Sequence, residues 1–178
     1  MPVNDAPVAV VTGGAGSIGR AIVEALGADH RVAVLDLEGE PPVDLADEEA
    51  ARAAARAVLG RFGRCDVLVH AAAAMDRAPL EALDLATWRK VQSVNVESLV
   101  WLCQELVPAM RAASFGRVVV IVSDTLFSPV RDDMLAYVAS KGALVGLARA
   151  MAAALGRSGI TVNCVAPGLT PTPRSRRA

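Results

Sequence analysis

The chain has few of the residues on which cross-linked or metal-stabilised folds depend. It contains three cysteines, Cys65, Cys103 and Cys164, which are scattered along the sequence and odd in number. They match neither a disulfide framework nor a zinc-ligand spacing, so we expect free thiols in a reducing compartment and no metal site. The N-terminus lacks the basic and apolar regions of a signal peptide, and a cytoplasmic location is expected.

Strong charge and long apolar runs are also missing. The net charge of −1 gives no electrostatic reason to expect a nucleic-acid partner. No uninterrupted apolar run reaches the roughly 18 residues of a membrane span, so no membrane insertion is expected. With 53% hydrophobic and 21% charged residues, the chain is globular and not disordered. Its 178 residues predict a single domain, residues 1–178, in which 169–178 form an unstructured tail.

Short apolar runs alternate with helical patterns along the whole chain. The runs expected to form strands are residues 7–12, 31–36, 66–70, 117–123 and 160–165, with Val43 as the stub of a further strand. The helical patterns cover residues 17–28, 47–62, 80–113 (with breaks) and 133–156. Continuous Val and Ile runs indicate strands buried on both faces, as in a parallel sheet covered by helices. The predicted fold class is therefore α/β, a doubly wound Rossmann-type parallel sheet with about six strands in the order 3-2-1-4-5-6 and helices on both faces.

A glycine-rich turn directly follows the first predicted strand. Gly14, Gly16 and Gly19 satisfy the pattern G-x-G-x-x-G, and Asp36 ends the next strand, about 20 residues further on. Glycines let the backbone approach a pyrophosphate, whose charge lies at the N-terminus of the following helix. A carboxylate at Asp36 accepts hydrogen bonds from the adenosine ribose and repels a 2′-phosphate. The turn therefore predicts a dinucleotide site that prefers NAD to NADP, and the alternative is a turn needed only for tight strand–helix packing.

The single tyrosine of the chain, Tyr137, lies four residues before Lys141, one of only two lysines. Residues at positions i and i+4 lie on the same side of a helix. An ammonium group held beside a phenol favours the phenolate, so the phenol can exchange protons nearer neutral pH. The pair predicts a proton-transfer site. The alternative is a half-buried helix tyrosine beside a solvated lysine.

Together these motifs resemble the short-chain dehydrogenase/reductase family, classical type, over residues 8–172. The glycine turn matches the family at Thr12, Gly13 and Gly19. The family's middle glycine corresponds to Ser17, and this chain has Gly16 one residue earlier, a spacing that also suits the extended branch of sugar epimerases and dehydratases. The resemblance implies a NAD(P)-binding Rossmann fold with oxidoreductase activity.

The resemblance also implies a catalytic set of Ser123, Tyr137, Lys141 and Asn95. Ser123 ends the predicted strand 117–123, 14 residues before Tyr137, and Ser128 in the following loop is the alternative. In the family's mechanism, Tyr137 is the general base in oxidation and the general acid in reduction, while Ser123 hydrogen-bonds the substrate oxygen. Lys141 would lower the pKa of the tyrosine and bind the nicotinamide ribose, and Asn95 would hold a relay water.

The cofactor, NAD with NADP less expected, should bind along the ends of the predicted strands. The residues expected to contact it are Gly13, Gly14, Gly16, Ser17, Ile18, Gly19, Asp36, Leu37, Asp44, Leu45, Ala71, Ala72, Tyr137, Lys141, Pro167, Gly168 and Thr172. The segment His70-Ala71-Ala72-Ala73 stands where the family has Asn-Asn-Ala-Gly, and only Ala72 matches. A histidine that ends a central strand is more often a hydrogen-bonded structural residue than a catalytic group, so His70 is left outside the catalytic set.

These observations predict an oxidoreductase that transfers a hydride between NAD(H) and a secondary alcohol or ketone. Leu126, Phe127 and Met134 indicate an apolar wall, which favours a hydrophobic or cyclic alcohol. The helical segments 80–113 and 133–156 form the usual dimer face in this family, so a homodimer or homotetramer is expected. No nucleic-acid or membrane partner is expected.

Two other interpretations of the sequence stay open. One is a truncated, catalytically inactive protein that binds cofactor or partner chains, because family members continue for several tens of residues beyond Gly168. The other is a nucleotide-sugar epimerase of the extended branch, which normally needs a larger C-terminal domain. The presence of all four catalytic residue types favours the enzyme.

Overall fold

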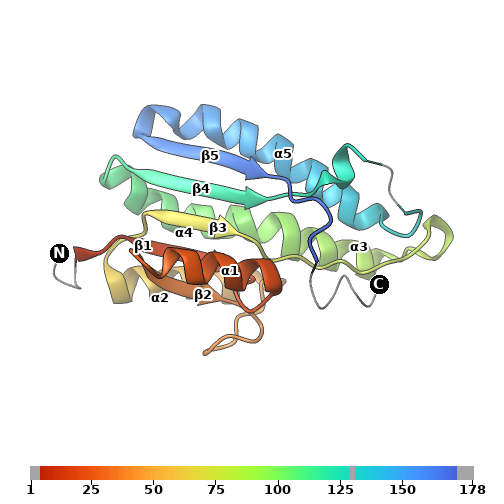
Figure 1. Ribbon diagram of the computed structural model, residues 1–178, viewed down its shortest axis with the longest axis horizontal. Helices are drawn as coiled ribbons and strands as arrows, with labels where there is room; N and C mark the ends of the chain where they lie inside the picture. The colour runs from red at the N-terminus through yellow and green to blue at the C-terminus, as the bar shows by residue number, and fades with distance from the viewer. Residues whose placement is uncertain (1–4, 129–130, 172–178) are drawn as a thin grey trace.

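The computed structural model describes residues 5–128 and 131–171, and its centre is a parallel five-stranded sheet in the order β2-β1-β3-β4-β5. The strands are β1 (Val8–Thr12), β2 (Arg31–Leu35), β3 (Val67–His70), β4 (Gly116–Ile121) and β5 (Ile160–Val165). Every neighbouring pair is parallel, and all the arrows in Figure 1 point the same way. The loops that leave the five strands therefore meet at one edge of the sheet.

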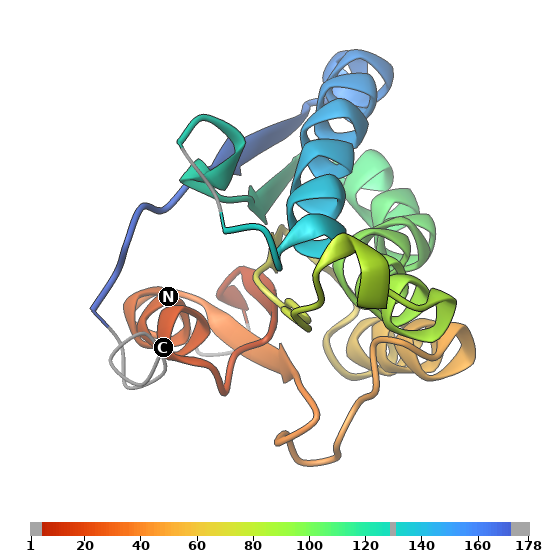
Figure 2. The same cartoon turned by 90° about the vertical axis from the view of Figure 1, so that its right-hand side faces the viewer.

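Helices cover the two faces of this sheet unequally. They are α1 (Ser17–Leu26), α2 (Glu48–Phe62), α3 (Leu85–Gln92), α4 (Ser98–Ala112) and α5 (Leu135–Leu155). Figure 2, which is turned by 90° from Figure 1, shows α1 on one face of the sheet and α2, α4 and α5 on the other. Short 3-10 turns at Leu80–Ala82, Asp124–Leu126 and Gly156–Ser158 complete the connections.

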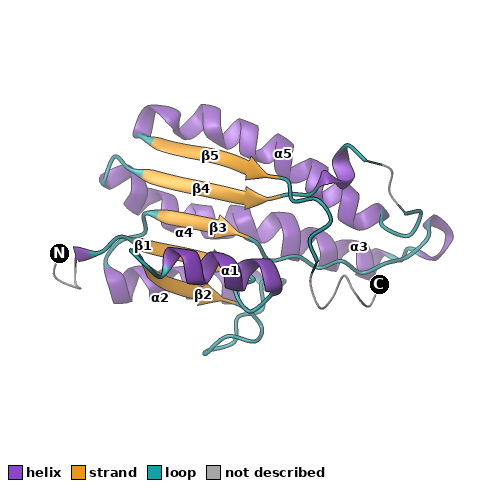
Figure 3. Ribbon diagram, viewed as in Figure 1, coloured by secondary structure: helices purple, strands orange, loops and turns teal. Residues whose placement is uncertain are grey.

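The strand side chains alternate between two hydrophobic clusters, as the period of a strand requires. Val8 and Val10 belong to the larger cluster, which includes residues of α2, α4 and α5. Val11 points the opposite way and packs with Ile22 and Val23 of α1. Within the described residues, no helix lies over β4 and β5 on the α1 side, as Figure 3 makes visible. That half of the sheet face is open, and Val165 is 48% exposed.

The predicted fold class is confirmed, with one strand fewer than expected. Val43 was predicted as the stub of a third strand, but it lies in the loop between β2 and α2. Its backbone N–H donates to the carbonyl of Asp36 at 2.8 Å, so the loop folds back on the end of β2. The buried side chain of Val43 contributes to the larger cluster without any strand around it. The remaining strands have the predicted order.

The predicted helical segment 80–113 is interrupted by a π-helical turn, η3 (Ser93–Glu97), between α3 and α4. A π-turn inserts one residue into an α-helix and is common at functional sites. Asn95, at its centre, is completely buried. The turn therefore directs a polar side chain into the protein between two otherwise regular helices.

The segment Leu135–Ser158, which contains α5, is long and apolar enough to cross a membrane by length and composition alone. In the structure α5 packs against β5, α3 and η3. It also buries Tyr137, Ser140 and Lys141. Because these polar groups lie on the face that packs against the rest of the protein, α5 is a helix of the protein core.

Candidate active site

The turn between β1 and α1 touches the backbone that follows β3. Gly13 has a φ of +67°, and a Cβ atom built on it would lie 2.7 Å from the Cα of Ala72. A Cβ on Gly19 would lie 2.0 Å from the carbonyl oxygen of Gly13. Neither position can carry a side chain without moving backbone. The close approach that a dinucleotide turn needs is therefore present at Gly13 and Gly19.

The first turn of α1 offers unpaired backbone donors to an anion. Its N-cap is Gly16, which makes no side-chain capping bond. The N–H of Gly16 donates to the carbonyl of Gly13 at 3.1 Å, which closes the turn beneath the helix. Gly16 and Ser17 are exposed, so the N-terminus of α1 faces solvent. An exposed, uncapped helix N-terminus fits a phosphate group.

The carboxylate of Asp36, at the end of β2, is attached to this turn. Its Oδ2 accepts from the N–H of Ala15 at 3.0 Å, and its Oδ1 accepts from the N–H of Glu38 at 3.0 Å. Both oxygens keep a free lone pair for a further donor. Asp36 thus lies beside the glycine turn, as the sequence predicted.

Three other residues predicted to bind cofactor lie near the same loop but differ in exposure. Leu37 is 66% exposed. Asp44 is exposed and accepts from the N–H of Ala46 at 2.8 Å, which makes a local turn. Leu45 is buried in the main hydrophobic cluster, so its side chain serves packing.

Tyr137 and Lys141 lie together on the buried side of α5. The Nζ atom of Lys141 is 5.5 Å from the centroid of the Tyr137 ring. Lys141 is only 2% exposed, and its Nζ donates to the main-chain oxygen of Ile121, at the end of β4, at 2.8 Å. Burial lowers the pKa of Lys141 from 10.5 to about 8. Near neutral pH the site therefore holds a buried ammonium that is close to its point of deprotonation.

Ser123 follows β4 and caps the 3-10 turn Asp124–Leu126. Its Oγ accepts from the N–H of Thr125 at 3.3 Å, and the serine is 7% exposed. The N–H of Asp124 donates to the oxygen of Pro167 at 3.2 Å, which joins this turn to the segment after β5. The ends of β4 and β5 are thus tied together where Ser123 and Pro167 were predicted to act.

The side chain of Asn95 is fully engaged with protein groups. Its Oδ1 accepts from the N–H of Ala74 at 2.7 Å, and its Nδ2 donates to the oxygen of Ala74 at 3.0 Å. The same Nδ2 donates to Ser140 Oγ at 2.9 Å. Both amide hydrogens of Asn95 are therefore used. The asparagine fastens the segment after β3 to α5.

His70, at the end of β3, is completely buried between Thr12 and η3. Its Nδ1 lies 3.1 Å from Thr12 Oγ1, and its Nε2 lies 2.9 Å from the main-chain oxygen of Asn95. Burial lowers the pKa of His70 to about 4, and the positive charge of Lys141 acts in the same direction against the opposing hydrogen bond to Asn95. The imidazole is therefore neutral at physiological pH, and both of its ring nitrogens have partners.

The structure brings two residues into this site that were not predicted as site residues: Thr12, which was named only as a match to the family's glycine turn, and Ser140. Thr12 Oγ1 accepts from the N–H groups of Ala71 and Ala72, both at 3.1 Å. Ser140 Oγ donates to the oxygen of Tyr137 at 2.7 Å. The available signal was their type, because each is a hydroxyl residue within an apolar strand or helix. Thr172 lies outside the described residues, and no cluster of possible metal ligands occurs among the described ones.

A sequence model of the family described as short chain dehydrogenase matches residues 7–178. The chain belongs to the short-chain dehydrogenase family. It is thus an oxidoreductase of this family with a nucleotide-binding Rossmann fold.

Individual relatives agree with this membership. "Probable galactose dehydrogenase GalD" of Rhizobium meliloti (strain 1021) is 34% identical, with 94% of this chain and 73% of that protein aligned. D-threitol dehydrogenase of Mycolicibacterium smegmatis is 33% identical, with 98% of this chain and 74% of that protein aligned. A metagenomic short-chain oxidoreductase in complex with NADP superposes with a TM-score of 0.85 at 34% identity, over 92% of this chain and 83% of the other.

Replacing Lys141 with methionine should change how stability depends on pH. The folded-state pKa of Lys141 is about 8 against an ordinary value of 10.5, so between these values the unfolded chain binds a proton that the folded chain has lost. Stability contributed by this group therefore rises with pH across the window, by up to about 3 kcal/mol. We expect urea unfolding from pH 7.5 to 10.5 to give wild type an increasing advantage over Lys141→Met.

The other lysine supplies the matched control, since Lys90 is exposed and paired with Asp76. Lys90→Met should follow the wild-type profile. Burial raises the pKa of Cys65 and Cys103 to about 12, which opposes the trend equally in all three proteins and cancels in the comparison. Parallel profiles for wild type and Lys141→Met would contradict the lowered pKa of the buried lysine.

Proposed function

We propose that the protein is a NAD(H)-dependent oxidoreductase that interconverts a secondary alcohol and the corresponding ketone. The observation that carries this proposal is the buried Tyr137–Lys141 pair, which lies at the edge of the sheet where the glycine turn also opens. A dinucleotide bound along that edge would bring its nicotinamide toward the tyrosine. Family membership supports the reaction class.

The residues around the sheet edge fit a dinucleotide in both space and charge. The turn at Gly13 and Gly19 leaves no room for side chains, and the N-terminus of α1 is uncapped. The residues proposed to hold the cofactor are Gly13, Gly14, Gly16, Ser17, Ile18, Gly19, Asp36, Leu37, Asp44, Leu45, Ala71, Ala72, Tyr137, Lys141, Pro167 and Gly168. We assign Leu45 an indirect part, because its buried side chain supports the loop.

The preference for NAD over NADP is proposed from Asp36. Its carboxylate lies beside the glycine turn, where it would accept hydrogen bonds from the hydroxyl groups of an adenosine ribose. A 2′-phosphate would meet this negative charge at close range and be repelled. The metagenomic relative binds NADP, so the proposal concerns the charge at Asp36 in this chain and not the family as a whole.

In oxidation, Tyr137 would take the hydroxyl proton of the substrate, and in reduction it would return a proton to the ketone oxygen. NAD supplies the hydride acceptor in oxidation and, once reduced, the hydride donor in the reverse direction. Ser123 Oγ would donate to the substrate oxygen, where negative charge develops. The ammonium of Lys141 would stabilise the phenolate and is placed to exchange a proton, because its pKa is about 8.

Asn95 would act through its backbone in this scheme. Its amide group already bonds Ala74 and Ser140 through every hydrogen, so a relay water would bind its main-chain oxygen. A carbonyl oxygen has two lone pairs, and the bond with His70 uses one of them. Asn95 would thus both order the segment after β3 and hold the proton path to Lys141.

The substrate is proposed to be a small secondary alcohol or ketone with an apolar part. Leu126 and Phe127 follow Ser123, and Phe127 is 80% exposed where a substrate would enter. Met134 is buried, so we assign it only an indirect part in this wall. The named relatives act, by their names, on galactose and D-threitol, which are hydroxylated compounds.

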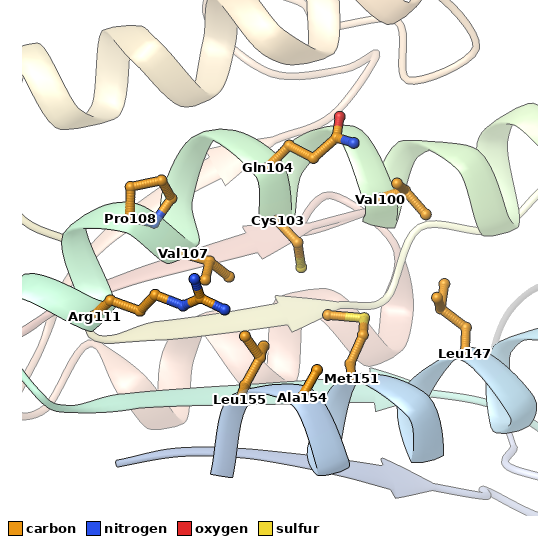
Figure 4. Close-up of a pocket in the computed structure, with 10 residues that line it drawn as sticks. All are labelled: Val100, Cys103, Gln104, Val107, Pro108, Arg111, Leu147, Met151, Ala154 and Leu155. Atoms are coloured by element: carbon orange, nitrogen blue, oxygen red, sulfur yellow. The ribbon is translucent and has the colours of Figure 1, made fainter. Parts of the chain in front are cut away.

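We further propose that the enzyme works in the cytoplasm as a homodimer or homotetramer built on α4 and α5. A groove of about 610 Å³ runs between these helices, and its lining is mostly apolar (Figure 4). Val107, Leu147 and Met151 point into it, and Arg111 closes one end. A second copy that packs its own α4 and α5 here would cover this apolar surface.

Cofactor selectivity can be measured by fluorescence titration with NADH and with NADPH. Wild type should bind NADH at least about tenfold more tightly, because a single charge repulsion of this kind exceeds 1.4 kcal/mol at low dielectric. Asp36→Asn keeps an oxygen for the Ala15 N–H but removes the charge, so NADPH binding should improve and the preference should shrink.

Glu38→Gln is the matched control for this titration. It removes a neighbouring exposed carboxylate and should leave the ratio of the two affinities unchanged. Equal affinities in wild type would contradict the NAD preference. Binding of neither cofactor would reject the dehydrogenase proposal for this chain and favour the non-catalytic alternative.

The role of Tyr137 can be tested by Tyr137→Phe, which keeps the buried ring and removes the hydroxyl. Turnover of a panel of secondary alcohols should fall by at least about 100-fold, since general acid–base catalysis contributes about 10²–10⁴-fold. NADH binding should persist, because the ring still packs. A wild type that binds NADH but turns over no member of the panel would instead support a cofactor-binding protein without catalysis.

The proposed self-association can be tested with two alanine-to-arginine substitutions. Ala154 is an exposed residue of α5 that lines the groove, and Ala57 is an exposed residue of α2 outside it. Sedimentation velocity should give an oligomer for wild type and for Ala57→Arg, and a smaller species for Ala154→Arg. A monomeric wild type, or an effect of both substitutions alike, would reject this face as the interface.

A further inference from the structure

A line of buried hydrogen bonds joins the strand before the glycine turn to the catalytic helix. It passes from Thr12 in β1 to His70 in β3, and from there to the backbone of Asn95 in η3. The amide of Asn95 continues it to Ser140 Oγ, which donates to the oxygen of Tyr137. Each of these side chains is less than one-tenth exposed. His70 is the member that connects the two halves.

The partners of His70 allow a single arrangement of protons. The main-chain oxygen of Asn95 can only accept, so Nε2 of His70 carries the hydrogen. The hydroxyl oxygen of Thr12 already accepts from the N–H groups of Ala71 and Ala72, so its own hydrogen points at Nδ1. The imidazole is therefore the neutral Nε2–H tautomer, with a donor on one side and an acceptor on the other.

We propose that His70 is a positioning residue for both parts of the active site. Through Nε2 it fixes the direction of the Asn95 carbonyl. Through Nδ1 and Thr12 it fixes the backbone of Ala71 and Ala72 against the glycine turn. This inference rests on the proposed function, and it assigns His70 more than the support of the sheet that its strand-end position implies.

The Asn95 carbonyl matters because the rest of the residue is committed. Its amide hydrogens are both donated, and its Oδ1 accepts from Ala74. The carbonyl is thus the group left to hold a relay water toward Lys141. The Nε2 hydrogen bond of His70 constrains the direction of this carbonyl.

The Nδ1 side of His70 acts, through Thr12, on the glycine turn that is proposed to bind the cofactor. Gly13 lies so close to Ala72 that even a Cβ would meet it at 2.7 Å. Any shift of the Ala71–Ala72 backbone would therefore displace the turn that the pyrophosphate is proposed to use. Thr12 holds that backbone by two hydrogen bonds, and His70 orients the Thr12 hydroxyl.

Two substitutions can each keep one of the two hydrogen bonds of His70 and remove the other, because their polar atoms lie at different numbers of bonds from Cα. The asparagine oxygen stands as many bonds from Cα as Nδ1, so His70→Asn can keep an acceptor for Thr12 and loses the donor to Asn95. The glutamine amide nitrogen stands as many bonds away as Nε2, so His70→Gln can keep the donor and loses the acceptor. Both are neutral, polar and smaller than or similar to histidine.

The two variants should divide the kinetic parameters between them. His70→Asn should lower kcat by about tenfold or more with the NADH affinity nearly retained, because a misplacement of about 1 Å in an active site can cost about 100-fold. His70→Gln should weaken NADH binding several-fold and keep most of kcat. His30, beside Asp29 at the opposite edge of the sheet, gives the matched controls His30→Asn and His30→Gln, which should change neither parameter.

A structural role alone would give a different result. If both His70 variants lowered the melting temperature alike while the folded proteins kept wild-type kcat and NADH affinity, the proposal would be overturned. The same conclusion would follow if both variants lost kcat and affinity in equal proportion, because the two ends would then not act separately.

Amide exchange gives a readout that does not depend on activity. The N–H of Ala74 is held by Asn95 Oδ1 at 2.7 Å, so its exchange reports whether η3 keeps its position. We expect His70→Asn to speed exchange at Ala74 by about tenfold or more relative to wild type and His70→Gln. Equal exchange in all three would reject the link between His70 and Asn95, even if wild type bound no NADH and the proposed function had failed.

Discussion

Backbone-to-backbone contact between two loops governs the architecture of this protein. The turn after β1 and the segment after β3 leave neighbouring parallel strands at the same edge, and they meet where Gly13 lies against Ala72. Such contact requires a residue without a side chain on one strand end and small residues on the other. It also buries N–H groups that no strand can satisfy, and the Thr12 hydroxyl accepts them. The open edge at which we propose that a cofactor binds and the polar interior behind it follow from one packing requirement.

The buried polar side chains of Lys141 and His70 have hydrogen-bond partners in the interior. An isolated charge in this position would be unstable, and the Lys141 ammonium is stabilised by the oxygen of Ile121. A charged imidazole a short distance away would add a second cation, and His70 avoids this by having a donor and an acceptor as its neighbours. The site therefore concentrates its single positive charge beside the Tyr137 ring.

The fold could be predicted from the sequence because a parallel strand that is buried on both faces has a continuous run of apolar residues, such as 118–122. The glycine turn, Asp36 and the Tyr137–Lys141 spacing could also be found, since each depends on residues near one another in sequence. Val43 was misassigned because a single buried valine does not reveal whether its neighbours pair or turn. The bond between His70 and Asn95 spans 25 residues and involves a main-chain oxygen, so no side-chain pattern records it.

The helices α3 and α4 are joined directly by the π-turn η3. This turn makes their side chains point in different directions around the helix axis. Each residue of an α-helix turns the side chains by about 100°, so one added residue rotates everything after it by more than a quarter turn. Ahead of the turn, α3 faces α5, and after it α4 faces α2 and β4. The inserted residue rotates the side chains of α4 about the helix axis relative to those of α3. The two consecutive helices therefore pack against different elements. The number of residues between Gln92 and Ser98 therefore matters as much as their identity. Deleting one residue would restore a regular α-helix from α3 to α4, remove the rotation between them and turn Asn95 away from Ala74.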